Sequence, residues 1–247
     1  ELFDLSPKPL QTAGKPNGFT DWLFSTARTE QGRFPDWPYL REYAAVLESG
    51  QDLVVLKRRQ ILISWVTAAW YHYNASRLPY HHGAVISAGK VASAKQGRRI
   101  VRVARLDGYD VAGVDLIKYA SGSEIAIFPS TEHAGVGESL PLGVHFDEYD
   151  FHPYGRQNLA TVTPAVSNSN GQIVITSTAN PEMGDAGPFA EAWQGETSGK
   201  RLFMGRYVLP DQGPAADFWE AERNRPGMTA SVMRAYYPES ANDAFLS

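Results

Sequence analysis

Hydrophobic residues in this chain occur in two patterns that alternate along the sequence. Short apolar runs without a helical period predict buried β-strands, and they occupy Leu53–Leu56, Ala84–Ser87, Gly143–Phe146 and Ile173–Thr176. Apolar residues at helical spacing follow the first two runs, at Ser64–Ala75 and Val91–Leu106. Strands that alternate with helices predict a mainly parallel sheet with helices on both faces, whose ligands bind at the carboxyl ends of the strands.

The flanking segments divide the chain into three parts. Residues 1–33 begin rich in Pro and Gly and predict an extended arm with a short helix at Thr20–Ala27. Residues 34–181 form the predicted α/β core, which also holds a helix at Trp37–Leu47 and a hairpin of Asp115–Ala120 and Glu124–Pro129. Residues 182–247 are again rich in Gly and Pro, with one β-type run at Leu202–Leu209, and predict a smaller lid or linker.

Composition narrows the classes of function. The chain has 247 residues, a net charge of −4 and no Cys, which excludes thiol catalysis, disulfides and Cys-ligated zinc and permits an intracellular setting. No apolar stretch approaches the ~18 residues of a membrane span, and the first residues lack the apolar core of a signal peptide. Because the chain starts with Glu1 rather than Met, we expect a trimmed or processed piece. The negative net charge argues against a broad basic face, so we expect any contact with DNA to be local.

The first segment with candidate chemistry is the loop after the first predicted strand, residues 56–65 (LKRRQILISW). A standard phosphate-binding loop reads G-x-x-x-x-G-K-[ST], in which backbone N–H groups hold phosphates, the Lys reaches the terminal phosphates and the hydroxyl contacts Mg²⁺. Ser64 stands at the hydroxyl position. Leu62 and Ile63 stand where the Gly and Lys belong, and Lys57 occupies the position of the first Gly. From these residues alone, an ordinary strand-to-helix turn with a basic surface loop is an equally good interpretation.

Two further predicted strands end in polar residues that suit the same chemistry. Residues 143–151 (GVHFDEYDF) place Asp147 and Glu148 after an apolar run, where an Asp holds the Mg²⁺ shell and a Glu polarises the attacking water. Residues 173–181 (IVITSTANP) end a strand in Thr176, Ser177 and Thr178, whose hydroxyls suit a γ-phosphate sensor. Each motif alone is common, because carboxylates or hydroxyls at a strand end often only cap the next turn.

Taken in this order, the motifs resemble those of bacteriophage large terminases. Members of that family often carry a deviant phosphate loop of the form K-x-R-Q-x-G-x-S, and the residues that match it here are Lys57, Arg59, Gln60 and Ser64. Leu62 departs from the pattern at the Gly position, where only Gly takes positive φ without a steric cost. Residues 117–151 and 236–247 also resemble terminase segments, the latter one that precedes the nuclease domain, so the resemblance covers residues 34–247.

The resemblance implies a P-loop NTPase of the ASCE, RecA-like type that binds ATP and Mg²⁺. The implied roles are phosphate binding for Lys57, Arg59 and Gln60, Mg²⁺ coordination for Ser64 and Asp147, orientation of the attacking water for Glu148, and sensing of the γ-phosphate for Ser177 and Thr178. The family pattern requires Lys57 but not its neighbour Arg58. We therefore expect the loss of Arg58 to cost much less activity than the loss of Lys57.

At the level of function, the resemblance implies a motor domain that hydrolyses ATP to drive double-stranded DNA into a capsid. The implied partners are double-stranded DNA, a portal protein, a small terminase subunit and further copies of the chain in a ring on the capsid. In isolation we expect a monomer. The site of action would be the host cytoplasm and, transiently, the viral procapsid. We expect a nuclease domain to follow residue 247, and no nuclease activity within this piece.

The arginines require separate interpretation. Family members often carry a trans-acting Arg in the Gly-rich loop before the Asp-Glu pair, but this chain has Val136 there, so that role does not transfer. Four other arginines lie three or four residues apart on one predicted helix: Arg98, Arg99, Arg102 and Arg105. They predict a basic face that either contacts phosphates or DNA or is simply solvated. Trp37 and Tyr39 are candidates for stacking on adenine, with core packing as the alternative.

Two other functions fit the same motifs. A superfamily-2-like helicase core would carry a second RecA-like domain after residue 247 instead of a nuclease domain. A docking module with a degenerate phosphate loop would bind nucleotide weakly or not at all, and Leu62 and Ile63 favour this alternative.

Overall fold

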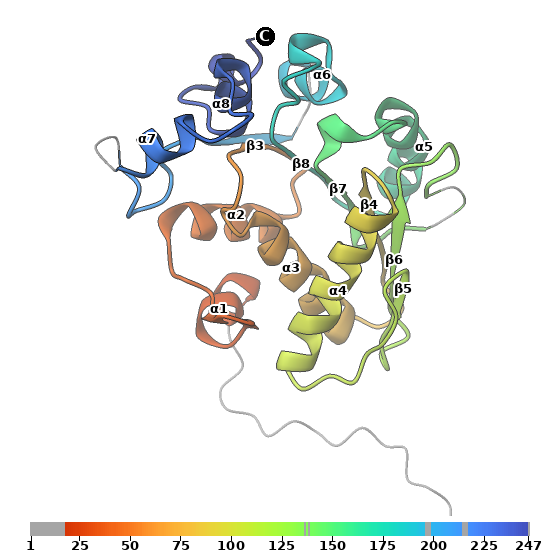
Figure 1. The fold of residues 1–247 in the computed structure, drawn as a ribbon. Coiled ribbons are helices and arrows are strands. Elements are labelled where there is room, and N and C mark those ends of the chain that lie inside the picture. The colour runs from red at the N-terminus through yellow and green to blue at the C-terminus, as the bar shows by residue number, and fades with distance from the viewer. Residues whose placement is uncertain (1–17, 136, 138, 196–198, 214–216, 247) are drawn as a thin grey trace, which may run out of the picture.

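The computed structural model describes residues 18–135, 137, 139–195, 199–213 and 217–246. These residues form a seven-stranded sheet with the order β5-β6-β4-β7-β8-β3-β9, flanked by helices on both faces (Figure 1). The strands are β3 (Leu53–Lys57), β4 (His82–Ser87), β5 (Leu116–Lys118), β6 (Glu124–Pro129), β7 (Gly143–Asp147), β8 (Ile173–Ser177) and β9 (Lys200–Met204). All neighbouring pairs are parallel except β5 with β6, which confirms the predicted α/β fold.

The central strands are buried on both faces, which explains their continuous apolar sequence. Every residue of β3 and of β7 is buried. On one face of β3, Leu53 and Val55 pack with α1 (Phe19–Ser25), α2 (Pro38–Ser49) and α3 (Ile63–Arg77). On the other face, Val54 and Leu56 pack with α5 (Gly155–Asn168) and α6 (Pro188–Gln194). Helix α4 (Lys90–Leu106) covers β4 and β6 beside α3, so the sheet lies between two helical layers.

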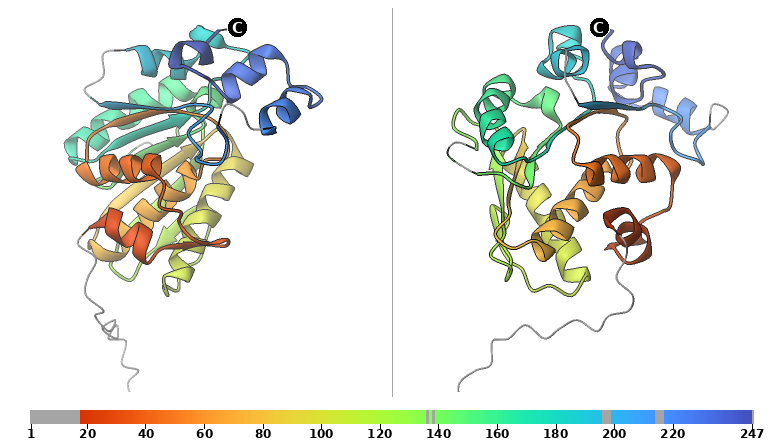
Figure 2. Two further views of the ribbon diagram at one scale, coloured as in Figure 1. Left: turned by 90° about the vertical axis from the view of Figure 1, so that its left-hand side faces the viewer. Right: turned by 180° about the vertical axis from the view of Figure 1, so that it is seen from behind.

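The described residues after 182 contribute both to the sheet and to a helical cluster at its edge. Strand β9 pairs parallel with β3 and so extends the sheet. Beyond it lie α7 (Phe218–Arg223), α8 (Ala230–Tyr236) and α9 (Ala241–Ala244), which Figure 2 shows together at one end of the molecule. Trp219, Met233 and Tyr237 form a small apolar core there. We refer to residues 205–213 and 217–246 as the C-terminal segment.

Most elements agree with the sequence pattern, and the differences have local causes. Helices α3 and α4 each begin one residue earlier than predicted. Strands β5 and β6 pair antiparallel around Gly122, which has φ 81°. The pattern does not reveal α5, because Pro164 lies inside this helix. The short helix of the predicted arm is present as α1, whereas residues 1–17 lie outside the described residues. Within the described chain, no helix combines the length and the apolar character that a membrane crossing requires.

Candidate functional site

The candidate residues from three parts of the chain meet at the carboxyl ends of neighbouring strands. Strand β8 lies between β3 and β7, and the three run parallel. The loop of residues 58–62, the pair Asp147 and Glu148, and Thr178 therefore follow adjacent strand ends. An open cleft of about 690 Å³ lies at this edge, and its lining includes Lys57, Arg59, Gln60, Ser64, Arg99 and Glu148.

The loop between β3 and α3 adopts left-handed backbone at two residues that are not glycine. Gln60 has φ 62° and Leu62 has φ 66°, and Leu62 is the N-cap of α3. Left-handed backbone costs a residue with a Cβ roughly 1–2 kcal/mol. The chain thus adopts at Leu62 a conformation that suits Gly, and it keeps a strained turn.

Contacts with the helical layer hold this strained loop in place. The Tyr39 hydroxyl donates to the carbonyl of Ile61 at 3.1 Å, and Leu62 packs against the apolar cluster of α1, α2 and α3. The N-terminus of α3 has no side-chain cap, and the Trp65 N–H donates to the carbonyl of Leu62, so the amide N–H groups of Ile63 and Ser64 are the ones available to an anion. The loop therefore presents backbone donors to the cleft.

Lys57 and Glu148 lie 91 residues apart in sequence and form an ion pair in the cleft. Lys57 Nζ donates to Glu148 Oε1 at 2.6 Å, and the Lys57 side chain is only 5% exposed. Glu148 Oε2 accepts two hydrogen bonds from Thr178, one from the backbone N at 3.1 Å and one from Oγ1 at 3.3 Å. Three residues for which the terminase resemblance predicts roles in phosphate binding, water orientation and γ-phosphate sensing are thus in one hydrogen-bonded group.

Ser64 and Asp147 form a second hydrogen-bonded group beside the first. Ser64 Oγ donates to Asp147 Oδ1 at 2.9 Å. The other carboxylate oxygen, Asp147 Oδ2, accepts a hydrogen bond from Gln96 Nε2 on α4. Hydrogen bonds therefore orient both carboxylate oxygens of Asp147. The carboxylate lies next to the Ser64 hydroxyl, the other group that the terminase resemblance predicts as a Mg²⁺ ligand.

The surroundings of Asp147 favour its ionised form. Burial by itself would raise the pKa of this carboxyl. The charges of Lys57 and Arg99, together with the neighbouring His145 ring, outweigh burial and hold the pKa below its ordinary value. His145 is fully buried in β7, where its Nε2 shares a hydrogen bond with Thr176 Oγ1 at 2.9 Å and burial lowers its pKa to about 4. At neutral pH the site thus contains a carboxylate beside a neutral imidazole.

The two arginines of the loop have different environments. Arg59 is exposed at the cleft, and its guanidinium lies 3.5 Å from the centre of the Tyr236 ring in the C-terminal segment. Arg58 is buried, and its Nη1 donates to the carbonyl of Arg206 and to Gln212 Oε1, both at 2.9 Å. The sequence pattern gives Arg58 no role, but the structure shows a buried contact between loop and C-terminal segment. Arg58 therefore has a structural role, because it joins the loop to the C-terminal segment.

Ser177 occupies a buried position away from the cleft lining. Its Oγ donates to the carbonyl of Thr178 at 2.6 Å and accepts from the backbone N of Asp150 at 3.1 Å. Asp150 in turn accepts from the backbone N of Asn180 and of Phe189. Ser177 thus joins the turns that follow β7 and β8, whereas Thr178 contacts Glu148. A role for Ser177 toward the γ-phosphate stays a prediction.

Two residues of α4 belong to the site: Gln96, which the sequence pattern did not indicate, and Arg99, which it left as one of four arginines that either contact phosphates or DNA or are solvated. Gln96 holds Asp147, and Arg99 lines the cleft. The spacing of three residues on the helix after the second parallel strand is a signal that places both on one helix face. The spacing does not tell which of the four arginines of this helix lines the cleft. Only the folded structure shows that it is Arg99.

The other candidates lie elsewhere or outside the described residues. Tyr39 is buried in the core and stacks with Trp37 at 5.9 Å between ring centroids, so core packing is confirmed for Tyr39. Val136 lies outside the described residues. Among the residues that the structure describes, no group of three or more His, Asp or Glu side chains is arranged to hold a metal ion.

The parallel sheet, the loop between β3 and α3 and the carboxylates at the end of β7 define an α/β domain with the P-loop NTPase fold. Solved structures narrow this fold to that of phage large terminase ATPase domains. An Arg-to-Ala variant of the Thermus phage P74-26 domain matches with a TM-score of 0.64 and 16% identity, over 83% of this chain and 93% of that chain.

Two longer proteins match in the same way. The large terminase of bacteriophage HK97 has a TM-score of 0.63 and 12% identity, over 90% of this chain and 51% of that one. The large terminase of a thermophilic bacteriophage, in complex with ADP, has a TM-score of 0.55 and 12% identity, over 77% and 48%. The chain thus spans about half of these two proteins. No family model and no curated protein matches the chain. At these identities, the likeness establishes the fold.

Proposed function

We propose that this chain is the ATP-hydrolysing motor domain of a phage large terminase, which drives double-stranded DNA into a capsid. One observation carries the proposal: three sequence motifs converge in two hydrogen-bonded groups, whose members are Lys57, Glu148 and Thr178, and Ser64 and Asp147. They lie at the strand ends where such α/β folds bind their ligands. The likeness to terminase ATPase domains, one of them in complex with ADP, supports ATP as the substrate.

Binding of the triphosphate would change the partner of Lys57. The buried Lys57 ammonium and the N-terminus of α3 would bind the phosphates, with Arg59 and Gln60 at the mouth of the cleft. Because Lys57 pairs with Glu148, a phosphate that attracts the ammonium weakens this ion pair. Glu148 then accepts a hydrogen bond from the attacking water, while Thr178 holds its other oxygen.

The donors present also fit Mg²⁺. Ser64 Oγ and the Asp147 carboxylate are hard oxygen ligands that already lie side by side, and Gln96 fixes the direction of the carboxylate from behind. When bound, the ion would neutralise charge on the phosphates. The residues of this chain that would hold it are therefore Ser64 and Asp147.

The partners of the proposed motor are double-stranded DNA, a portal protein, a small terminase subunit and further copies of the chain in a ring. Action in the host cytoplasm and transiently on the procapsid belongs to the same proposal. A ring belongs to the proposal because a neighbouring copy could complete a site whose Gly-rich loop has Val136 in place of Arg. In isolation the chain is expected to be a monomer.

A second candidate rests on the strained turn at Leu62. Because left-handed backbone at this residue is costly and its side chain lies in the cleft lining, a nucleotide-docking module with little hydrolysis also fits the loop. A helicase core is a third candidate with the same active-site chemistry, and strand separation of a DNA duplex by the full-length protein would identify it.

Mg²⁺-dependent ATP hydrolysis, measured in single-turnover experiments, tests the enzyme proposal. Glu148→Gln should bind ATP normally but lose at least about 100-fold in rate, because the amide no longer accepts the proton of the water. Lys57→Ala should weaken ATP binding as well. Glu132→Gln in an exposed loop is the control and should match the wild type. Binding without any hydrolysis would favour the docking module, and an unchanged rate in Glu148→Gln would exclude this residue from the reaction.

A further inference from the structure

Arg99 is a cation that the fold places in the cleft, near the charges of Asp147 and Glu148. Its side chain lines the same cleft as Lys57 and Glu148 and is half-buried. Among the residues that the structure describes, its guanidinium forms no hydrogen bond or ion pair, and its aromatic neighbour is Trp65, with 6.0 Å to the ring centroid. Burial lowers the pKa of Arg99, while the charges of Asp147 and Glu148 oppose this shift. A cation held in this way is suited to an anionic ligand.

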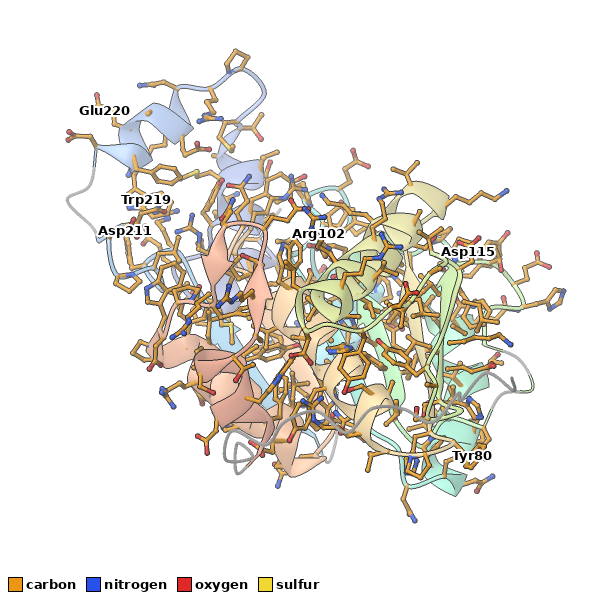
Figure 3. All side chains as sticks on the ribbon, turned by 90° about the horizontal axis from the view of Figure 1, so that it is seen from below. Tyr80, Arg102, Asp115, Asp211, Trp219 and Glu220 are labelled. Atoms are coloured by element: carbon orange, nitrogen blue, oxygen red, sulfur yellow. The ribbon has the colours of Figure 1, made fainter. Side chains whose placement is uncertain are left out.

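The other arginines of α4 have different surroundings. Arg102 pairs with Glu30 at 3.0 Å, and Figure 3 labels it on this helix. Arg105 Nε donates to the carbonyl of Val111 at 3.3 Å. Arg98 is exposed and lines a separate pocket with Arg102 and Arg105. Of the four arginines in this row, Arg99 is thus the one that lines the cleft beside the acidic pair.

The position of Arg99 is fixed by the residue one turn before it. Gln96 is buried and donates to Asp147, so this face of α4 is held against the end of β7. Lys95 and Ala92, earlier on the same helix, also line the cleft. Helix α4 therefore forms a wall of the cleft, and Arg99 supplies a planar donor group to it.

We propose that Arg99 binds the terminal phosphate of the nucleotide from within the same chain. This inference rests on the proposed function, and it leaves room for an arginine that a neighbouring copy contributes in the ring. In the reaction, a water oxygen bonds to the γ-phosphorus and the bond to the bridging oxygen breaks, which leaves ADP and phosphate. Glu148 accepts the proton of the water, and Arg99 N–H groups donate to the γ-phosphate oxygens on which negative charge is concentrated.

The proposal predicts selective loss of affinity for the triphosphate. In Arg99→Ala, ATP should bind about 10- to 100-fold more weakly while ADP affinity changes by less than about threefold, since ADP lacks the phosphate concerned. The single-turnover rate should fall by about 100-fold. Arg98→Ala removes the adjacent exposed arginine and should match the wild type, and Arg99→Lys should recover only part of the affinity because it lacks the planar fork.

Calorimetric titration of the whole chain with ATP, ADP and tripolyphosphate, in the presence of Mg²⁺, is the measurement. A thermal melt is the fold control: Arg99→Ala should melt no lower than the wild type, since it removes a desolvated cation that forms no hydrogen bond or ion pair with the described residues. Equal loss of ATP and ADP, unchanged ATP affinity, or a lower melting temperature would each overturn the assignment. If Lys57→Ala and Glu148→Gln are impaired but Arg99→Ala is normal, the ATPase proposal stands and this one fails. If the wild type binds neither ATP nor tripolyphosphate, both fail.

Discussion

Replacement of Arg58 by Ala should lower the free energy of unfolding, because Arg58 joins the phosphate loop to the C-terminal segment. Arg58 is 2% exposed and lies among the rings of Phe218, Trp219 and Tyr237. Its guanidinium carbon is 5.0 Å from the centroids of the Trp219 and Tyr237 rings and 5.7 Å from that of Phe218. Figure 3 shows Trp219 in the part of the molecule formed by α7. Arg58→Ala removes these ring contacts and both hydrogen bonds of Nη1.

The expected loss of stability follows from these contacts. Two hydrogen bonds from a charged donor contribute about 3 kcal/mol together, and stacking of a desolvated guanidinium on aromatic rings contributes about 2 kcal/mol. The cavity left by the longer side chain adds about 1–2 kcal/mol. Release of the buried charge returns about 3 kcal/mol of desolvation free energy. The net expectation is a decrease of about 3–4 kcal/mol in the free energy of unfolding.

Urea unfolding, followed by far-UV circular dichroism and by Trp fluorescence, measures this change. Arg59→Ala is the matched control, since Arg59 is exposed and stacks on a single ring, so its free energy of unfolding should change by less than about 1 kcal/mol. The fluorescence change in Arg58→Ala should include Trp219, which loses a cation beside its ring. Equal destabilisation by the two substitutions, or a change below about 1 kcal/mol in Arg58→Ala, would refute the reasoning.

Three further predictions concern pH, the strained loop and assembly. His145 has a folded pKa of about 4, below its unfolded value, so its contribution to stability is complete above about pH 6.5 and is lost as the pH falls toward 4; the loss is about 3 kcal/mol. Unfolding measured against pH should show a shallower acid slope in His145→Gln than in the wild type; equal slopes in the two proteins would contradict the assignment. Leu62→Gly should raise ATP affinity several-fold in calorimetric titration, because Gly takes the left-handed backbone without strain; weaker binding would show that the Leu62 contacts matter more than the strain. The isolated chain should be a monomer in light scattering and should hydrolyse ATP slowly in a steady-state assay. A fast turnover that does not depend on protein concentration would argue against completion of the site in a ring.

The sequence by itself determined the elements and the order of the motifs. Continuous apolar runs such as Val54–Leu56 are typical of strands buried on both faces, and their alternation with helices indicated a parallel sheet covered by helices. Because parallel strands end at one edge, it also followed that Lys57, Asp147 and Thr178 would lie near one another. The clear departure from the usual loop, Leu62, was visible in the sequence as well.

Only the tertiary structure decided which side chains contact each other across those strand ends. The partnership of Lys57 with Glu148, and of Gln96 with Asp147, joins residues 91 and 51 positions apart, and no local pattern encodes such distances. The same reason separates the arginines. Arg58 and Arg59 are neighbours in sequence, but only Arg58 is buried, because the C-terminal segment packs over it. Arg98 and Arg99 are also neighbours, but Arg98 is exposed and Arg99 is half-buried, because α4 turns Arg99 toward the cleft.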